Sequence, residues 1–229
     1  MLNDHRRALW YALALLACLG FVLIAVGRHP ASVAPQTSIS FVGRFDQQMY
    51  DAVDHIRVTP LTWLFRFLNL VGGGVVTIPL RALVSIYLLA RRWWRRAAAF
   101  IVTWAVTEVV LAFLKSWFHR GRPPGSLVAT VGHSFPSGHA TAGAATAVAL
   151  VLAFLPAGRT RRKWEWIAVA FAFFMAFSRV YLHAHWFSDV VAGVLLGSGI
   201  ALGAFALANE IATLVLHRPV DQPETAAEV

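Results

Sequence analysis

Charged residues are scarce in this sequence. Only 14% of its 229 residues are Asp, Glu, Lys or Arg, whereas 58% are hydrophobic. Soluble domains carry about 25% charged residues, so this composition excludes an ordinary soluble protein. There is one cysteine, Cys18, which excludes an intramolecular disulfide. Acidic residues are the rarer charge, 11 against 20 Lys and Arg, and leave a formal net charge of +9.

Six apolar stretches are long enough to cross a bilayer. A transmembrane helix needs roughly 20 apolar residues, because backbone groups in hydrocarbon must satisfy one another. The stretches are residues 8–27, 71–90, 97–117, 138–155, 164–182 and 190–207. The sequence therefore predicts an all-α, polytopic membrane protein with six transmembrane helices. We expect one domain over residues 1–218, followed by a polar, proline-containing and disordered tail over residues 219–229.

The basic residues indicate the orientation. They gather in short clusters at residues 91–96 and 159–163, with others near both ends of the chain at residues 5–7 and 217–218. Short loops rich in Lys and Arg stay in the cytoplasm, so both termini are predicted inside. Dispersed clusters at helix ends favour anionic lipid headgroups as partners over nucleic acid. A cleaved signal peptide is the alternative for the first stretch, but its length and the basic residues after it favour a retained helix.

Two segments between the first and second stretches are predicted to lie at the membrane surface. In residues 45–56, apolar residues recur at helical spacing opposite Asp46, Asp51 and Asp54. Thr59 is then expected to cap a second interfacial helix that has Pro60 at its first position. Residues 72–74 are all glycine, and they lack the Lys-Ser/Thr of a P-loop, so we expect a loop or a close helix contact there. Four further glycines between residues 193 and 203 are predicted to allow close helix packing.

Three segments, residues 115–123, 135–139 and 178–189, concentrate the side chains that can bind or attack a phosphate. Lys115, Arg122 and Arg179 are cations suited to a phosphoryl group. Ser137 can donate its hydroxyl, and the backbone near Gly138 opens a helix whose N-terminus favours anions. Together these groups could stabilise the charge of phosphoryl transfer.

A nucleophile and an acid complete this set. His185 and Asp189 are four residues apart, so a helical turn brings them to the same face. Asp189 could then orient the imidazole of His185 and make it a competent nucleophile. His139 is left to protonate the leaving oxygen and afterwards to activate water.

The pattern Lys-x6-Arg-Pro, Pro-Ser-Gly-His and Ser-Arg-x5-His-x3-Asp resembles that of the type-2 phosphatidic acid phosphatase (PAP2) superfamily, in its membrane-bound bacterial lipid phosphatase branch. The resemblance implies phosphate binding by Lys115, Arg122, Ser137, Gly138 and Arg179, acid–base catalysis by His139, and a nucleophilic His185 supported by Asp189. It implies neither a metal nor a cofactor.

The pattern assigns no role to His119, Arg120 or His183. For these residues we expect surface positions or positions that support the phosphate-binding groups, and contact with the substrate headgroup is the less favoured alternative. Tyr181 and Trp186 are expected to be interfacial anchors, and Ser188 is a candidate cap of the last helix.

Two charged residues fall inside apolar stretches. Arg81 and Glu108 lie ten and twelve residues from the basic cluster at 91–96, about 15 and 18 Å deep at the usual helical rise. An isolated charge there costs on the order of 3 kcal/mol, so the two are predicted to pair. The alternative is that either lines a polar path to the site.

The sequence thus predicts metal-independent hydrolysis of a lipid phosphate or diphosphate through a phosphohistidine, at the extracytoplasmic membrane face. Phosphatidic acid, phosphatidylglycerol phosphate and undecaprenyl diphosphate are equally compatible substrates. A lipid phosphotransferase using the same histidine, a vanadate-dependent haloperoxidase and an anion transporter are the alternatives. The oligomeric state is not encoded in these patterns.

Overall fold

The described residues form a helical bundle. The computed structural model describes residues 2–27 and 41–216, and within them it contains eight α-helices and no β-strand. The helices are α1 (Leu2–Gly27), α2 (Phe41–His55), α3 (Thr59–Gly72), α4 (Gly74–Ala90), α5 (Trp94–Phe118), α6 (Gly138–Phe154), α7 (Arg159–Tyr181) and α8 (Phe187–Leu216). The predicted all-α fold is confirmed. The predicted disordered tail lies outside the described residues, and so does the segment directly after the first apolar stretch, where a signal peptide would be cleaved.

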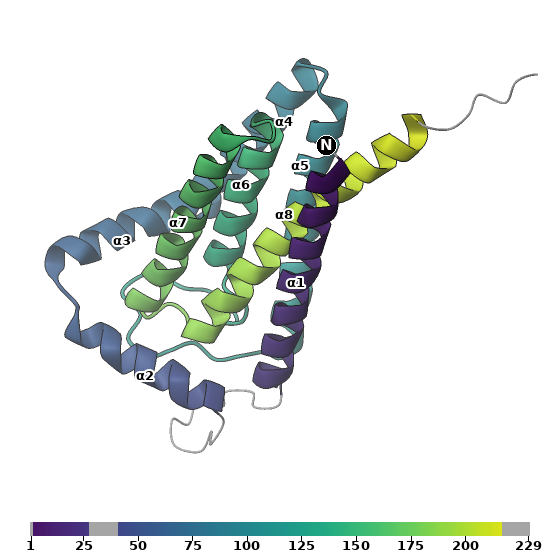
Figure 1. Ribbon diagram of the computed structural model, residues 1–229. Helices are drawn as coiled ribbons and strands as arrows, with labels where there is room; N and C mark the ends of the chain where they lie inside the picture. Colours follow the sequence, from purple (N-terminus) through teal and green to yellow (C-terminus); the bar gives the residue numbers. More distant parts are fainter. Residues whose placement is uncertain (1, 28–40, 217–229) are drawn as a thin grey trace, which may run out of the picture.

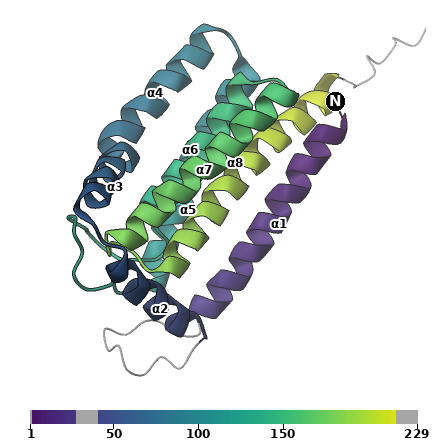
Figure 2. The same ribbon diagram turned by 60° about the vertical axis from the view of Figure 1, so that its left-hand side comes forward.

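Helix α8 forms the centre of the bundle and contacts α1, α5, α6 and α7 (Figures 1 and 2). Glycine makes the contact between α6 and α8 possible, and the approach is closest at Gly197, where an added Cβ would overlap the carbonyl oxygen of Thr141. A Cβ atom added to Gly193 of α8 would lie 2.8 Å from the carbonyl oxygen of Ser137, just before α6. The predicted role of this glycine in close helix packing is confirmed. At Gly203 the nearest atom would be 3.9 Å away, so packing does not require glycine there.

The apolar helices make this a membrane protein, but six spans are not confirmed. Three described helical segments are long and apolar enough to cross a bilayer, Arg7–Gly27, Trp94–Phe118 and Phe187–Leu214. The consecutive helices α3 and α4 meet at a bend of 44° and would together provide a fourth. Helix α6 is apolar but only 17 residues long. Helix α7 begins with residues 159–163, the basic cluster predicted to be a connector, so its first turn is strongly charged.

Helix α2 lies across one end of the bundle, against α7 and α8 (Figure 1). Its amphipathic character is confirmed, but the predicted polar face is wrong for one residue. Asp46 is 2% exposed, whereas the apolar Phe45 and Ile56 are 37% and 47% exposed. An ion pair described below explains why a carboxylate occupies this buried position. Helix α3 starts at Thr59 with Pro60 in its first turn, but its N-cap is Val58, so the predicted Thr59 cap is wrong.

The predicted intramembrane ion pair is present. Nη1 of Arg81, on α4, lies 2.8 Å from Oε1 of Glu108, on α5. The same guanidinium donates to Oγ1 of Thr146 at 2.8 Å and to the carbonyl oxygen of Ala142 at 3.1 Å, both on α6. Arg81 therefore joins three helices.

The connections fall at two opposite ends of the bundle. Figure 1 shows the N-terminus, the α4–α5 and α6–α7 connectors and the last turns of α8 at one end. The α5–α6 and α7–α8 connections lie at the other end with α2. We call these the basic end and the site end, because the first carries the arginine-rich connectors and the second carries all three phosphate-binding segments.

Candidate active site

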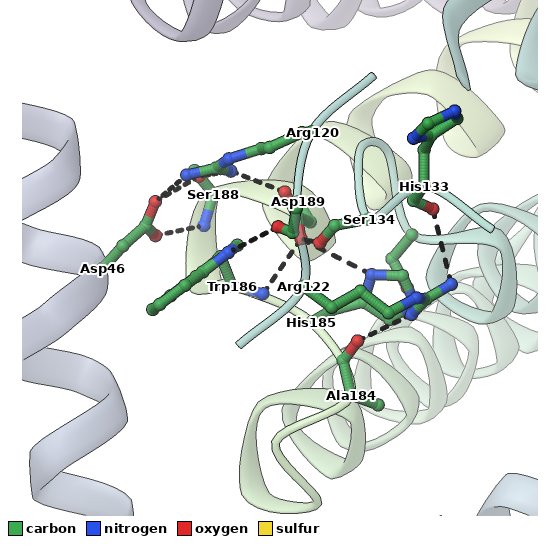
Figure 3. A network of polar contacts seen from close by, with 12 residues as sticks. Asp46, Arg120, Arg122, His133, Ser134, Ala184, His185, Trp186, Ser188 and Asp189 are labelled. Atoms are coloured by element: carbon green, nitrogen blue, oxygen red, sulfur yellow. Dashed lines mark hydrogen bonds and ion pairs between the residues drawn. The ribbon is translucent and has the colours of Figure 1, made fainter. Parts of the chain in front are cut away.

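The three segments singled out in the sequence converge at the site end. They contribute the last turn of α5 with the following loop, the start of α6, and the α7–α8 turn with the start of α8. Figure 3 shows side chains from the α5–α6 loop and the α7–α8 turn in one polar network beside α2.

The α7–α8 turn positions His185 and Asp189. The amide nitrogens of Ala184 and His185 both donate to the carbonyl oxygen of Arg179, so the turn folds back onto the end of α7. Asp189 sits in the first turn of α8, where its Oδ2 accepts from the amide of Trp186 at 2.9 Å. An acidic side chain reaching back to the residue before its helix is the second half of a capping box. Asp189 therefore caps α8, which had been expected of Ser188.

His185 and Asp189 face each other, as their spacing predicts. Nδ1 of His185 lies 3.4 Å from Oδ2 of Asp189, and the two side chains are 3% and 0% exposed. This contact is too loose for a formed hydrogen bond, and Nδ1 has no hydrogen-bond partner. Since catalytic hydrogen bonds are often long before substrate binds, the geometry is compatible with Asp189 orienting the ring.

The other ring nitrogen of His185 faces a cation. Nη1 of Arg122 lies 3.2 Å from Nε2 of His185. A guanidinium can only donate, so Nε2 accepts through its lone pair and the ring proton belongs on Nδ1, toward Asp189. Burial lowers the pKa of His185 to about 4, opposed by the Asp189 carboxylate and reinforced by the charges of Arg179 and Arg122. The imidazole is therefore neutral at pH 7 and directs a lone pair at an arginine.

Arg122 is held by backbone carbonyls. Its guanidinium donates to the oxygens of Ala184 at 2.7 Å, Val131 at 2.8 Å and Gly132 at 2.9 Å. Lys115 reaches the same place from α5, since its Nζ donates to the carbonyl of His133 at 2.7 Å, an oxygen that Arg122 also contacts at 3.3 Å. The two cations thus share the carbonyl oxygen of His133.

Arg179 and His139 are joined by Asn69, a residue that the motif search missed. Nη1 of Arg179 donates to the side-chain oxygen of Asn69. Nε2 of His139 lies 3.1 Å from the backbone oxygen of the same residue and donates to it. Asn69 stands near the end of α3, just before Gly72, where an added Cβ would lie 3.2 Å from Cδ2 of His139. The glycine run was predicted to allow a close contact, and at Gly72 that contact is with Met175, whose Sδ would lie 2.5 Å from the added Cβ, and with His139.

Ser137 stands just before the N-terminus of α6, with Gly138 as the first helical residue. Its side chain is 0% exposed, yet its Oγ has no hydrogen-bond partner. Its amide donates to the carbonyl of Asp189 at 3.0 Å, which fixes it beside His185 and Asp189. An unsatisfied buried hydroxyl next to a helix N-terminus is suited to donating to an anion.

A second network, also missed in the sequence, lies behind Asp189. Arg120 is 4% exposed, and it pairs with Asp189 at 2.5 Å and with Asp46 at 2.6 Å. Ser188 donates its amide and hydroxyl to Asp46 at 2.8 and 2.6 Å, and Ser134 donates its hydroxyl to Asp189. Arg120 therefore takes the supporting position that was one of its two expected roles.

His119, His183 and Tyr181, to which the motifs assign no role, differ in how deeply they are buried. His119 is exposed, as expected. His183 is buried and stacks on Tyr50 with ring centroids 3.8 Å apart. Tyr181 is 0% exposed and accepts from the amide of Val58 at 3.0 Å, so the expectation of an interfacial anchor is wrong.

These groups define a class of protein. One end of an apolar bundle carries a buried neutral imidazole, three cations, an unsatisfied hydroxyl and a helix N-terminus, which are the groups that phosphoryl transfer requires.

Comparisons with known proteins agree with this class. The PAP2 superfamily model matches residues 96–212. An undecaprenyl-diphosphatase of Sulfolobus acidocaldarius is 32% identical over 165 residues, which cover 69% of this chain and 75% of the relative. A lipid A 4'-phosphatase of Bacteroides thetaiotaomicron is 29% identical over 149 residues, 57% of this chain and 64% of the relative. The chain belongs to the PAP2 superfamily, and it is a phosphatase.

Solved structures match the fold. A transmembrane PAP2-type phosphatidylglycerolphosphate phosphatase from Bacillus subtilis superposes with a TM-score of 0.72 at 23% identity, covering 90% of this chain and 98% of that one. LpxE of Aquifex aeolicus superposes with a TM-score of 0.59 at 22% identity, covering 70% and 94%.

Proposed function

We propose that this phosphatase hydrolyses a lipid phosphate or lipid diphosphate through a phosphohistidine on His185. The observation that carries the proposal is the contact pattern of this ring. Nε2 faces Arg122 at 3.2 Å, and Nδ1 faces Asp189 at 3.4 Å. A neutral imidazole oriented by a carboxylate, with its lone pair in a cluster of cations, is a nucleophile aimed at a phosphoryl group.

The reaction follows from the placement of the groups. Nε2 of His185 attacks phosphorus, the bond from phosphorus to the leaving oxygen breaks, and His139 gives that oxygen a proton. Water then attacks the phosphohistidine while His139 takes a proton from it, and the N–P bond breaks to release inorganic phosphate. Lys115, Arg122 and Arg179 stabilise the phosphoryl oxygens in both steps, together with Ser137 and the Gly138 backbone. Asp189 stabilises the positive charge that the His185 ring carries once its Nε2 is bonded to phosphorus.

The proposal includes a topology of six spans within one domain over residues 1–218. It treats the bent pair α3–α4 as one span, which replaces the expectation that α3 lies at the membrane surface. It also adds α6 and α7, because both run along the apolar helices in the bundle (Figure 2). The arginine-rich connectors share the basic end with the N-terminus. By the rule that short basic loops stay inside, that end is cytoplasmic and the site faces the extracytoplasmic surface.

The substrate class follows from the position of the site and from the relatives. A phosphate-binding site at the end of a membrane bundle suits a substrate whose headgroup lies at the surface and whose tail stays in the bilayer. The relatives are named for undecaprenyl diphosphate and lipid A, and the structural matches include a phosphatidylglycerolphosphate phosphatase. We extend this lipid class to the present chain and include phosphatidic acid in it. Because the cations can balance phosphoryl charge by themselves, no metal or cofactor enters the mechanism.

Phosphate release by the purified protein tests the proposal. The panel contains undecaprenyl diphosphate, phosphatidylglycerol phosphate, phosphatidic acid and lipid A, each with EDTA present. We expect wild-type protein to release phosphate and His185→Ala to lose at least about a thousandfold in kcat, the scale seen when a nucleophile is removed. His119→Ala is the matched control, since His119 is exposed near the same loop.

The outcomes separate the candidate functions. Metal-independent release lost only in His185→Ala supports hydrolysis through this residue, and the panel ranks the lipids. Release that survives His185→Ala overturns the mechanism. Dephosphorylation of the first lipid that requires a second lipid as acceptor, and yields the phosphorylated second lipid instead of inorganic phosphate, identifies a phosphotransferase.

A further inference from the structure

A groove opens between α5 and α8 at the basic end, far from the phosphate-binding segments. Its volume is about 500 Å³. It is lined by Arg95, Ala98, Ala99 and Val102 of α5, and by Ala204, Leu207, Ala208, Ile211 and Ala212 of α8. Figure 1 shows the last turns of α8 projecting away from the bundle at this end.

The sequence explains the shape of this groove. The lining residues recur every three or four positions on each helix, so each set forms one helical face. Five of the nine are alanine, and their short side chains leave the space between the two helices open. At the rim, Val102, Leu207 and Ile211 are 47%, 59% and 51% exposed. In a membrane protein, such an apolar rim faces lipid tails, and a hydrocarbon chain is the ligand that the groove suits.

A smaller, basic cavity of about 170 Å³ adjoins the groove. The two share Arg95, Ala99 and Ala208. The smaller cavity adds Arg96, Arg161 and Asn209 to its lining, and neither Asp nor Glu lines it. Arg161 donates to Glu165 at 2.8 Å, while Arg96 lies over the ring of Trp93 at 4.7 Å. Three arginines therefore line the cavity that adjoins the apolar groove.

We infer that the groove and the basic cavity together bind one anionic phospholipid from the leaflet at the basic end. Its phosphate contacts Arg95, Arg96 and Arg161, and one acyl chain lies between α5 and α8. Charge and shape both support this occupant. A zwitterionic lipid would gain less binding free energy from three arginines, because its headgroup carries no net charge. A second protein chain would have to place an acidic group at the arginines and, beside it, a narrow apolar side chain in the groove.

Lipid retention tests the inference. The full-length protein is purified in detergent and mixed with phosphatidylglycerol or phosphatidylcholine of identical chains, and bound lipid is counted by native mass spectrometry. We expect one phosphatidylglycerol to be retained and to raise the unfolding temperature, with little effect of phosphatidylcholine. Arg95→Ala/Arg96→Ala should weaken phosphatidylglycerol retention by roughly 30-fold, at about fivefold for each arginine near an anionic surface.

Two further variants separate a built site from diffuse charge. Arg91→Ala/Arg92→Ala removes the same charge from the α4–α5 connector, outside the lining, and should leave retention unchanged. Ala208→Leu fills the groove without changing any charge and should reduce retention of phosphatidylglycerol. Equal retention of the two lipids by wild type, or equal losses in the two double-arginine variants, would overturn the inference. His185→Ala should retain the lipid normally, so this inference can fail or hold independently of the proposed function.

Discussion

Asp46 and Asp189 bind the same guanidinium. Nη2 of Arg120 lies 2.6 Å from Oδ2 of Asp46, and its Nη1 lies 2.5 Å from Oδ1 of Asp189. One carboxylate belongs to the helix that crosses the site end, and the other faces the proposed nucleophile (Figure 3). The position of α2 and the orientation of Asp189 are therefore coupled through a single side chain.

Replacing Arg120 is predicted to impair both stability and turnover. Arg120→Gln leaves two buried carboxylates without their cation, and breaking a buried pair in this way typically costs about 3–5 kcal/mol. Arg120→Lys keeps the charge but cannot bridge two carboxylates with a planar fork. We expect the lysine variant to lower kcat with little change in KM, because the phosphate-binding cations remain. Thermal unfolding and steady-state kinetics in detergent measure the two effects.

Asp46→Asn is the control for the predicted loss of stability in Arg120→Gln. It removes the carboxylate on α2 but leaves the pairing of Arg120 with Asp189. It should therefore destabilise the protein less than Arg120→Gln. A kcat for Arg120→Lys equal to that of wild type would show that the bridge to Asp189 has no positioning role.

The pH dependence of turnover is predicted from the burial of His185. Burial lowers the pKa of His185 from 6.5 to about 4, with Asp189 acting in the opposite direction. The neutral ring is the nucleophile, so the acid limb of kcat/KM that reports His185 should fall near pH 4. Asp189→Asn removes a group that raises this pKa, so the variant should be slower and its acid limb should move to lower pH. A His185-dependent limb near pH 6.5 would contradict the burial of the ring.

The same shift affects stability, with a defined sign. Between pH 6.5 and 4, His185 binds a proton in the unfolded chain but not in the folded one, so the unfolded state is favoured as pH falls. The free energy of unfolding should therefore decrease with falling pH in this window. His185→Gln should decrease less, and thermal unfolding of both proteins from pH 7 to pH 4 provides the comparison. Parallel curves would rule out a depressed pKa at this position.

The local parts of the site could be predicted from the sequence, and the long-range parts could not. His185 and Asp189 were paired because four residues make one helical turn, and Ser137 and Gly138 were assigned because they open a helix. Arg120 was not assigned, because Asp46 lies on a different helix and only the folded chain brings them together. Asn69 was missed for the same reason.

The membrane spans show a similar division. Apolar length predicted α1, α5 and α8 well. The basic residues at 159–163 were predicted to form a connector, but they belong to the first turn of α7. Hydropathy alone cannot distinguish a charged helix start from a loop. The pairing of Arg81 with Glu108 was predictable, since a charge at that depth needs a partner.

Removing either member of the Arg81–Glu108 pair is predicted to destabilise the bundle. Arg81 should be the costlier loss, since it also donates to Thr146 and Ala142. In a double-mutant cycle with Arg81→Ala and Glu108→Ala, we expect a coupling energy of about 0.5–3 kcal/mol. The exposed pair Arg161–Glu165, also 2.8 Å apart, is the control and should couple by about 0.3–0.5 kcal/mol. Strictly additive losses of unfolding free energy in the Arg81 and Glu108 variants would show that the pair does not stabilise the protein.

A methyl group at Gly193 is predicted to disturb the candidate active site by forcing apart the two helices α6 and α8. The added Cβ would lie 2.8 Å from the oxygen of Ser137 and 2.9 Å from Oγ1 of Thr141, so α6 and α8 must separate. Overpacking of this kind costs about 1–3 kcal/mol, and it would displace the α6 N-terminus from His185. Gly193→Ala should thus lose stability and activity together. Gly203→Ala, with no atom closer than 3.9 Å, should change neither, and matching losses in both variants would point to a general effect on α8.

Ser137→Ala is predicted to separate activity from stability. The Ser137 hydroxyl is fully buried without a hydrogen-bond partner, so its removal costs the folded protein no internal contact. Unfolding free energy should stay the same or rise by about 1 kcal/mol, since an unsatisfied polar group is lost. If the hydroxyl donates to the phosphoryl group as proposed, kcat/KM should fall by about 100-fold, the scale for losing one such donor. Ser116→Ala, which removes an exposed hydroxyl bonded within α5, is the matched control. Normal turnover in Ser137→Ala would show that this residue does not bind the phosphoryl group. Slow turnover in a fully stable protein would instead indicate that the hydroxyl contacts the substrate, which explains why it has no partner within the protein.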